Sequence, residues 1–395
     1  MKILVVLPRF PYPLEKGDKL RAYHQIVELS KRHSIYLFCV SHTRVVEAQI
    51  EALRPYCAGI RVVHLFRPAC WWGVVRNWLL AKSLQMGYWG TAKAKRACKA
   101  FCKAVEPDVV YGQMLRTMPL TARLPYPKVM DFQDALSMNA ERRMDKARGF
   151  WHYVLHFEFK MLRSSEYNAF SIYDALTIIS EADADAIPHK RSGEIRIVPN
   201  GVDFDYFSRA DEGAGCGEKR YDIVFCGNMS YAPNIDAVRY LTEEVMPKVW
   251  AKRPETTVLI AGTSPKRRVS KLGADSRVAV SGWMEDIREA YRTARVFAAP
   301  MQIGSGLQNK LLEAMAMGLP CATTTIAAAA IGIEDGRQAL VADGAEAFAE
   351  SLLTLLCDEA RAEALAEEGY RYVRERFGWE PAVEKLEAVL NEVAK

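Results

Sequence analysis

The sequence predicts an α/β protein with two doubly wound domains, each built on a parallel β-sheet with helices on both faces. Short apolar segments such as 34–41 and 222–228 recur along the chain, as expected of strands buried on both faces. Segments with helical spacing, such as 19–33, separate them. The polar, glycine-rich stretch at 208–220 interrupts this pattern, which then restarts. A length of 395 residues agrees with two domains joined there.

The individual elements follow from the same patterns. The first domain is expected to cover 1–205, with strands at 2–8, 34–41, 59–66, 108–113, 128–134, 174–180 and 195–201 and helices at 19–33, 91–107 and 148–170. The second is expected to cover 218–380, with strands at 222–228, 257–262, 277–282, 294–300 and 319–324, a helix near 234–252 and a helical tail from 345. Pro381 is expected to break that tail, and the last helix, 381–395, to pack back on the first domain. Ligands bind beyond the carboxyl ends of parallel strands, so a cleft between the facing domains is the expected site.

Composition narrows the class of protein. The net charge of +5 is mild, so it does not indicate a nucleic-acid partner, although it suits anionic ones. The nine cysteines are scattered without a C-x-x-C pair, and we interpret them as reduced thiols of a cytoplasmic protein without a metal site. The start of the chain is strand-like rather than a signal peptide, and no apolar run reaches the ~18 residues of a membrane span.

The stretch "GSGLQNKLLEAMAMGLP" at 304–320 is the main candidate for chemistry. It follows the predicted strand 294–300, and its two glycines lead into a helix whose first N–H groups are unpaired. Such a helix start favours an anion, and Lys310 in the first turn could reach a phosphate. Glu313 could accept hydrogen bonds from a ribose diol. An ordinary turn before a core helix with two solvated charges is the alternative.

Several motifs, in order, resemble those of family-4 glycosyltransferases with the GT-B fold. The stretch at 304–320 continues as "CATT", and "IRIVPNGVDFDYF" at 195–207, "FCGNMSYAPNIDAVRYL" at 225–241 and "VSGWMEDIREAYRTARVFAAP" at 280–300 match the same family. "PRFPYPLEKGDKLRAYHQIVEL" and "IISEADADAI" resemble the sugar transferases of bacterial exopolysaccharide and exosortase loci. The resemblance covers nearly the whole chain and implies two Rossmann-like domains.

The resemblance also implies roles for individual residues. The second domain would bind a nucleotide-diphosphate sugar, with Glu313 holding the ribose. Lys310 has no counterpart in this pattern; on physical grounds it is the nearest cation that could stabilise the leaving diphosphate. Gly282, Trp283 and Met284 are predicted to contact the base, and Gly227 and Asn228 to form the turn near the diphosphate. The residues predicted to contact the phosphates are Gly304, Ser305, Gly306, Leu307, Gln308 and Asn309. Retention at the anomeric carbon and no required metal or other cofactor are implied as well.

The chain departs from the family pattern at four positions. Ser305 lies eight residues before Glu313, where the family's paired-glutamate motif has its first glutamate, so the identity of the sugar stays open. Asn228 and Pro233 occupy positions that often hold an arginine and a lysine. Gln113 stands where many relatives have a histidine; it can hydrogen-bond a sugar hydroxyl but cannot act as a base.

The first domain would hold the acceptor. Gly17, Asp18, Lys19 and Arg21 follow the first strand, where relatives approach the donor phosphates and the acceptor, although the two cations could equally be solvated charges. His24 lies on an apolar-periodic helix and is interpreted as a packed core histidine.

Two aspartates in the loop at 131–143 are candidate acid/base groups. Asp131 and Asp134 follow a predicted strand end, but short acidic turns are also common without a catalytic role. Together with the positions above, the predicted catalytic set is Lys310, Gln113 and Asp134.

Residues 66–103 combine tryptophans and cations. The tryptophans are Trp71, Trp72, Trp78 and Trp89, and the basic residues are Arg67, Arg76, Lys82, Lys93, Lys95, Arg96, Lys99 and Lys103. Interfacial segments with this composition lie on anionic lipid, which predicts a peripheral contact with the inner face of the cell membrane. A flap of the acceptor domain with core tryptophans is the alternative.

The sequence as a whole predicts a retaining glycosyltransferase. Its donor would be a nucleotide-diphosphate sugar and its acceptor a glycan, expected to be lipid-linked, in bacterial cell-surface or exopolysaccharide synthesis. Alternatives of the same fold are a catalytically impaired sugar-nucleotide-binding subunit, an epimerase and a phosphorylase. An NAD dehydrogenase is disfavoured, because neither domain has G-x-G-x-x-G after its first strand.

Overall fold

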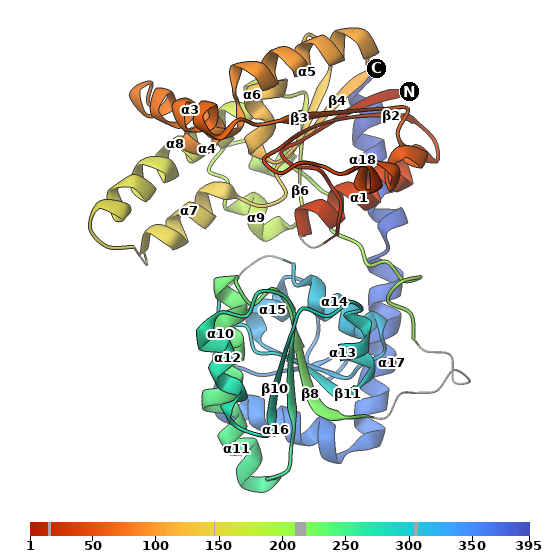
Figure 1. Ribbon diagram of the computed structural model, residues 1–395. Helices are drawn as coiled ribbons and strands as arrows, with labels where there is room; N and C mark the ends of the chain where they lie inside the picture. The colour runs from red at the N-terminus through yellow and green to blue at the C-terminus, as the bar shows by residue number, and fades with distance from the viewer. Residues whose placement is uncertain (15–16, 146, 210–218, 304–306) are drawn as a thin grey trace. The chain divides into compact units, whose positions relative to one another are not determined.

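The chain forms two compact units, which are described separately. The computed structural model describes residues 1–14, 17–145, 147–209, 219–303 and 307–395 (Figure 1). The first unit comprises Met1–Asn200 and Trp379–Lys395, and the second comprises Gly201–Gly378. The first unit therefore ends at Asn200 rather than 205, because Val202 donates its N–H to the Phe377 carbonyl at 2.7 Å and Phe207 is buried in the second unit. The predicted cleft between the domains stays a prediction.

The first unit is built on a seven-stranded, wholly parallel sheet in the order β3-β2-β1-β4-β5-β6-β7. The strands are β1 (Lys2–Leu7), β2 (Ser34–Ser41), β3 (Gly59–His64), β4 (Val109–Gln113), β5 (Lys128–Asp131), β6 (Ala175–Ile178) and β7 (Arg196–Ile197). Each predicted strand of this half is confirmed, although β7 is shorter than expected. All five residues of β4 are buried, as a central strand covered on both faces requires.

The helices of the first unit cover both faces of this sheet (Figure 1). They are α1 (Gly17–Ser30), α2 (Glu47–Glu51), α3 (Arg67–Leu79), α4 (Leu84–Trp89), α5 (Ala92–Val105), α6 (Met118–Thr121), α7 (Leu136–Asp145), α8 (Phe150–Ile172), α9 (Glu181–Asp185) and α18 (Trp379–Val393), with short 3₁₀ turns at Arg54–Tyr56, Leu115–Thr117 and Ser192–Glu194. Helix α18 begins at Trp379, so Pro381 lies in its first turn and does not precede it. The Trp379 ring stacks on His24 of α1 at 4.7 Å between centroids, which confirms His24 as a packed histidine.

The second unit has a six-stranded parallel sheet in the order β10-β9-β8-β11-β12-β13. Its strands are β8 (Tyr221–Cys226), β9 (Val258–Ala261), β10 (Val278–Gly282), β11 (Ala294–Ala299), β12 (Cys321–Thr323) and β13 (Leu340–Val341). The five predicted strands are confirmed, whereas the two-residue β13 was missed because it is too short to show a pattern. The predicted helix near 234–252 is α10 (Ala232–Tyr240) and α11 (Met246–Lys252), joined through a π turn at Leu241–Val245.

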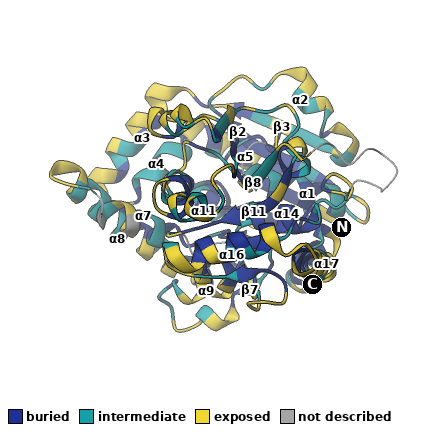
Figure 2. Cartoon of the chain, turned by 90° about the horizontal axis from the view of Figure 1, so that it is seen from below, coloured by how far each residue is buried: buried dark blue, intermediate teal, exposed yellow. Residues whose placement is uncertain are grey.

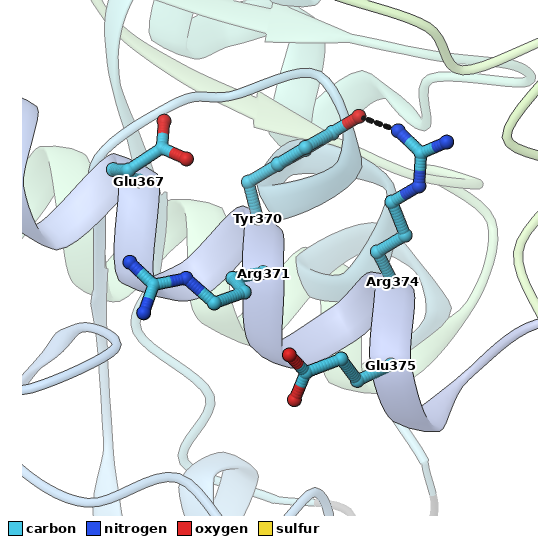
Figure 3. Close-up of a pocket in the computed structure, with 5 residues that line it drawn as sticks. All are labelled: Glu367, Tyr370, Arg371, Arg374 and Glu375. Carbon is cyan, nitrogen blue, oxygen red and sulfur yellow. Dashed lines mark hydrogen bonds between the residues drawn. The ribbon is translucent and has the colours of Figure 1, made fainter.

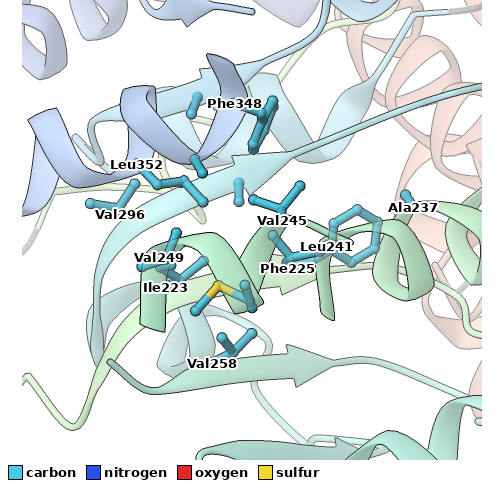
Figure 4. Close-up of a cluster of buried hydrophobic side chains, with 14 of the residues drawn as sticks. Ile223, Phe225, Ala237, Leu241, Val245, Val249, Val258, Val296, Phe348 and Leu352 are labelled. Atoms are coloured by element: carbon cyan, nitrogen blue, oxygen red, sulfur yellow. The ribbon is translucent and has the colours of Figure 1, made fainter. Parts of the chain in front are cut away.

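The remaining helices of this unit are α12 (Arg267–Ser270), α13 (Arg288–Arg292), α14 (Asn309–Ala316), α15 (Thr325–Ala329), α16 (Ala345–Cys357) and α17 (Glu359–Arg376), with a 3₁₀ turn at Lys271–Ala274. Figure 4 shows Ile223 and Phe225 of β8 packed with Val249 of α11 and Leu352 of α16 on one face of the sheet. The other face packs on α14, and Figure 2 shows buried residues along β11 and α14. Burial on both faces explains why these strands lack polar–apolar alternation.

A buried ion pair lies at the centre of the first unit. The Arg21 guanidinium of α1 donates to both Asp131 carboxylate oxygens at the end of β5, at 2.7 and 3.2 Å, and both side chains are 0% exposed. Asp131 also accepts hydrogen bonds from the hydroxyls of Tyr111 and Thr177, at 3.0 Å each. Arg21 further donates to Asn200 Oδ1 at 2.9 Å. The pair thus connects α1, β4, β5, β6 and the end of the unit, and all of its charge is compensated internally.

We expect Arg21→Met to cost about 3–5 kcal/mol of unfolding free energy, because it leaves the Asp131 carboxylate buried without its cation. Urea unfolding followed by tryptophan fluorescence measures this, since most tryptophans lie in the first unit. The control is Arg54→Met, which removes an exposed pair with Glu47 and Glu51 and should cost under ~1 kcal/mol. Equal losses in the two variants would contradict the structural role of the buried pair.

Candidate functional site

The candidate site lies where the strand order of the second sheet reverses. Successive strands run from β8 towards β10 on one side and from β11 towards β13 on the other, so the loops after β8 and β11 diverge at this point. Lys310 of α14, after β11, donates to Asn234 Oδ1 of α10, after β8, at 2.8 Å. Its ammonium also donates to Gln308 Oε1 at 3.1 Å. Lys310 therefore links the two helices that follow these loops, at the place where open α/β sheets bind their ligands.

Burial alters the acidity of Lys310. The ammonium lies 5.1 Å from the centre of the Phe225 ring, and desolvation lowers the pKa of Lys310 to about 8, against the opposing effect of the Glu313 carboxylate. The side chain is consequently protonated in most molecules at neutral pH but is close to its titration range. A partly buried cation whose partners are neutral amides is suited to binding an anion. An anion attracts the cation more strongly than an amide oxygen does, so it can replace those partners.

Glu313 lies one turn after Lys310 and is held by a buried tyrosine. The Tyr291 hydroxyl donates to Glu313 Oε2 at 2.8 Å, and Tyr291 is fully buried. Desolvation raises the pKa of Glu313, while the Tyr291 hydroxyl and the Lys310 charge act in the opposite direction. Tyr291 and Asn234 orient the two predicted site residues, Glu313 and Lys310. Neither Tyr291 nor Asn234 was identified from the sequence, because both are far from residues 310–313 along the chain.

Three glycines bring the ends of β8, β9 and β10 together. A Cβ on Gly262 would lie 1.8 Å from the Gly227 carbonyl oxygen, and Gly262 has φ +137°. A Cβ on Gly227 would lie 2.7 Å from Asn234 Nδ2, so the residue that binds Lys310 also excludes a side chain here. Gly282 has φ +70° and accepts a hydrogen bond from Gly262 N–H at 3.1 Å. Gly227 and Gly282 were predicted as site positions, whereas Gly262 was missed.

Other predicted positions of the second unit have varied surroundings. Trp283 is 67% exposed after β10, and Met284 packs against the hydrophobic core. Asn228 Oδ1 accepts hydrogen bonds from the Ser230 N–H and hydroxyl, at 2.9 and 2.7 Å, and therefore stabilises a turn. Pro233 lies in the first turn of α10.

The loop before α14 is described from residue 307 onwards. Leu307 packs on the core, Gln308 immediately precedes α14, and Asn309 is its first residue. The predicted phosphate-loop residues Gly304, Ser305 and Gly306 lie outside the described residues.

Two predicted residues of the first unit are corrected. Arg21 was expected to bind substrate, but it is fully enclosed in the ion pair with Asp131. Gln113 was expected to be catalytic, but it is 1% exposed and donates to Gln25 Oε1 at 3.1 Å. Asp131 likewise has a structural role. The sequence showed these side chains at strand ends but could not show that they pair with one another.

Asp134 differs from them because it is only partly buried. Its Oδ2 accepts a hydrogen bond from Asn139 Nδ2 at 2.9 Å, while its Oδ1 is buried and has no hydrogen-bond partner among the described residues. Desolvation and the nearby Asp183 raise the pKa of Asp134 to about 6, opposed by Asn139 and Arg116. Asp134 remains a candidate for contacting a hydroxyl-bearing substrate.

The start of α1 offers two further predicted positions. Gly17 is exposed at the first residue of the helix, and Asp18 forms a 2.9 Å ion pair with Arg9. Met114 after β4 and Gln133 after β5 have φ +64° and +66°, and such backbone strain is often found at functional sites.

A separate hollow lies on α17, in the second unit. It is lined by Glu367, Tyr370, Arg371, Arg374 and Glu375, and Figure 3 shows Arg374 donating to the Tyr370 hydroxyl. Arg209 pairs with Glu367 at 2.6 Å and lies over the Tyr370 ring. None of the predicted site residues lines this hollow. Its side chains Glu367 and Tyr370 bind Arg209 to α17.

In the part of the chain that the structure describes, no helix is both long enough and apolar enough to cross a membrane. No group of three or more His, Cys, Asp or Glu side chains in those residues is placed to hold a metal ion. The eight described cysteines are free thiols.

Comparisons with known proteins agree with this architecture. Residues 220–358 match the model of the family Glycosyl transferases group 1. A phosphatidyl-myo-inositol mannosyltransferase of Mycobacterium leprae is 26% identical over 203 residues, which are 50% of this chain and 53% of the relative. An uncharacterized 44.6 kDa protein in the cps region of Klebsiella pneumoniae is 22% identical over 396 residues, which are 95% of this chain and 96% of that protein.

A solved structure extends the similarity to both units. HepE of Anabaena, in complex with UDP-glucose, superposes with a TM-score of 0.70 at 16% identity and covers 99% of this chain and 100% of its own. This chain therefore has the GT-B fold. The residues that match the glycosyltransferase family model, 220–358, contain the Lys310–Asn234 bridge and the three glycines at the strand ends.

We expect Gly262→Ala to destabilise the protein by about 3 kcal/mol, because the added methyl meets a backbone carbonyl and the left-handed φ disfavours alanine. Calorimetric unfolding measures the loss. Gly193→Ala is the matched control, since its Cβ would meet nothing within 4 Å. If the two variants unfold at the same temperature, the close approach of the strand ends is wrong.

Proposed function

We propose that this glycosyltransferase transfers a sugar from a nucleotide-diphosphate sugar to a lipid-linked glycan, in bacterial cell-surface or exopolysaccharide synthesis. The observation that carries the proposal is the Lys310–Asn234 bridge at the reversal of strand order, with Glu313 one turn further along α14. Two relatives support it: the Klebsiella protein is from a cps region, and HepE was solved with UDP-glucose. The location proposed is the cytoplasm, at the inner face of the cell membrane.

The proposed reaction needs stabilisation of a leaving diphosphate. The bond between the sugar C1 and the diphosphate oxygen breaks, and C1 forms a bond to an acceptor hydroxyl oxygen with retention of configuration. The hydroxyl proton is lost, and the departing nucleoside diphosphate gains negative charge. Lys310 and the first N–H groups of α14 would stabilise that charge, so the proposal requires no metal ion.

Each substrate has proposed contacts on this chain. Glu313 would accept hydrogen bonds from the ribose diol, and Trp283 and Met284 would lie near the base. Asp134 would accept a hydrogen bond from an acceptor hydroxyl, because a carboxyl with a pKa of about 6 is ionised at neutral pH and the residue is only partly buried.

We expect Lys310→Ala and Glu313→Ala each to weaken donor binding roughly 10- to 100-fold, since each removes a charged hydrogen-bonding group. Calorimetric titration with UDP-, GDP-, dTDP- and ADP-sugars measures this and identifies the base. Lys271→Ala and Glu363→Ala, at exposed positions of the same unit, serve as matched controls. Wild-type affinity in both site variants would refute the site.

A second measurement, of nucleoside diphosphate release, separates a transferase from a binding subunit. A transferase releases nucleoside diphosphate when an acceptor lipid extract is added, whereas an impaired subunit binds the donor without releasing it.

We expect donor affinity to fall as the pH rises through about 8, because the folded protein loses the Lys310 proton there. Affinity should be constant well below that pH and about tenfold weaker one pH unit above it. Lys310→Arg should bind with little change over the same range, since a guanidinium keeps its charge. A wild-type profile as flat as that of the arginine variant would show that Lys310 does not hold the phosphates.

A further inference from the structure

Helix α3 has an apolar surface that the fold leaves in solvent. Trp72 and Trp78 are 68% and 61% exposed, and the neighbouring apolar side chains are similarly open. We define the α3 surface as Phe66, Trp71, Trp72, Trp78, Leu79 and Leu80. Figures 1 and 2 show α3 with α4, α7 and α8 at one side of the first unit. The start of α8 is also exposed and aromatic, at Phe150, Trp151 and Tyr153.

The opposite side of α3 makes the contacts that hold the helix in place. Cys70, Gly73 and Asn77 are buried, and a Cβ on Gly73 would lie 2.1 Å from the Gly87 carbonyl oxygen of α4. Asn77 donates to the Ser83 carbonyl at 2.8 Å. Trp72 and Trp78 are therefore not core residues, which argues against a flap with core tryptophans.

Uncompensated positive charge accompanies this surface. Residues 66–105 contain eight lysines and arginines and no aspartate or glutamate. Arg76 of α3, Lys82 and Arg123 are each close enough to Lys95 of α5 to repel its ammonium, and this repulsion adds to burial, the larger cause, in lowering the pKa of Lys95. A group of cations without a carboxylate partner in this segment favours a polyanionic surface.

We propose that the α3 surface and the cations Arg76, Lys82, Lys95 and Arg123 dock this glycosyltransferase on an anionic lipid membrane. Indole and aliphatic side chains insert at the level of the lipid headgroups, and the cations contact the lipid phosphates. A second copy of the chain is a poorer occupant, because it would bring the same positive charges to the contact. This docking proposal rests on the proposed function in one respect: a lipid-linked acceptor gives the enzyme a reason to bind a membrane.

Vesicle co-sedimentation of the full chain tests this proposal. We expect binding to vesicles of phosphatidylglycerol mixed with phosphatidylcholine, little binding to phosphatidylcholine alone, and release by added salt. The variant Lys82→Gln/Lys95→Gln should bind roughly 25-fold more weakly, at about fivefold for each cation removed. Trp72→Glu/Trp78→Glu should abolish binding. The matched controls are Val46→Glu, an exposed apolar position elsewhere on the unit, and Lys271→Gln on the second unit.

Three outcomes would overturn the proposal. These are equal binding to neutral and anionic vesicles, equal binding of the α3 variants and their controls, and a stable dimer in sedimentation that Trp72→Glu/Trp78→Glu converts to monomer. Donor titration of the same variants keeps this separate from the proposed function. Normal nucleotide-sugar affinity without membrane binding would refute the docking surface alone.

Discussion

Parallel pairing of every strand is the constraint on which the other features of this protein depend. Parallel strands require crossover helices, so both sheets are covered on both faces and their central strands, such as β4 and β9, are buried along their whole length. The same pairing places all carboxyl ends of a sheet at one edge, where the loops leave the core. Arg21, Asp131 and Asp134 in one unit, and Lys310, Glu313 and Gly227 in the other, are near such edges for this reason. Backbone direction thus determines where chemistry can occur before any side chain is considered.

The two units treat charge at these edges in different ways. In the first, Arg21 and Asp131 neutralise each other and are closed to solvent. Hydroxyl groups from two strands donate the remaining hydrogen bonds to the carboxylate. In the second, the hydrogen-bond partners of Lys310 among the described residues are neutral amide and thioether groups, and Glu313 lies nearby with one oxygen held by Tyr291. A compensated pair stabilises a fold, whereas a cation with neutral partners retains attraction for an anion. This difference distinguishes a structural cluster from a candidate binding site.

Glycine has a comparable double role in this protein. At Gly227 and Gly262 the missing Cβ lets two strand ends approach closely beside Asn234, and at Gly73 and Gly87 it lets α3 pack tightly on α4. The first approach shapes the candidate donor site. The close approach at Gly73 and Gly87 holds α3 by one face, and the tryptophans on the rest of α3 remain in solvent. Both effects are steric, and both are invisible in a hydropathy pattern.

The sequence by itself determined the architecture and predicted where a candidate donor site lies. Apolar runs separated by helical periodicity predicted twelve strands that the structure contains, and the ordered motifs indicated the glycosyltransferase class and Glu313. Tertiary structure alone decided which polar residues face one another. Asp131 and Asp134 stand three residues apart and look alike in sequence, yet only Asp131 meets Arg21, from 110 residues away. Burial and pairing arise from contacts between distant segments, and local periodicity contains no record of them.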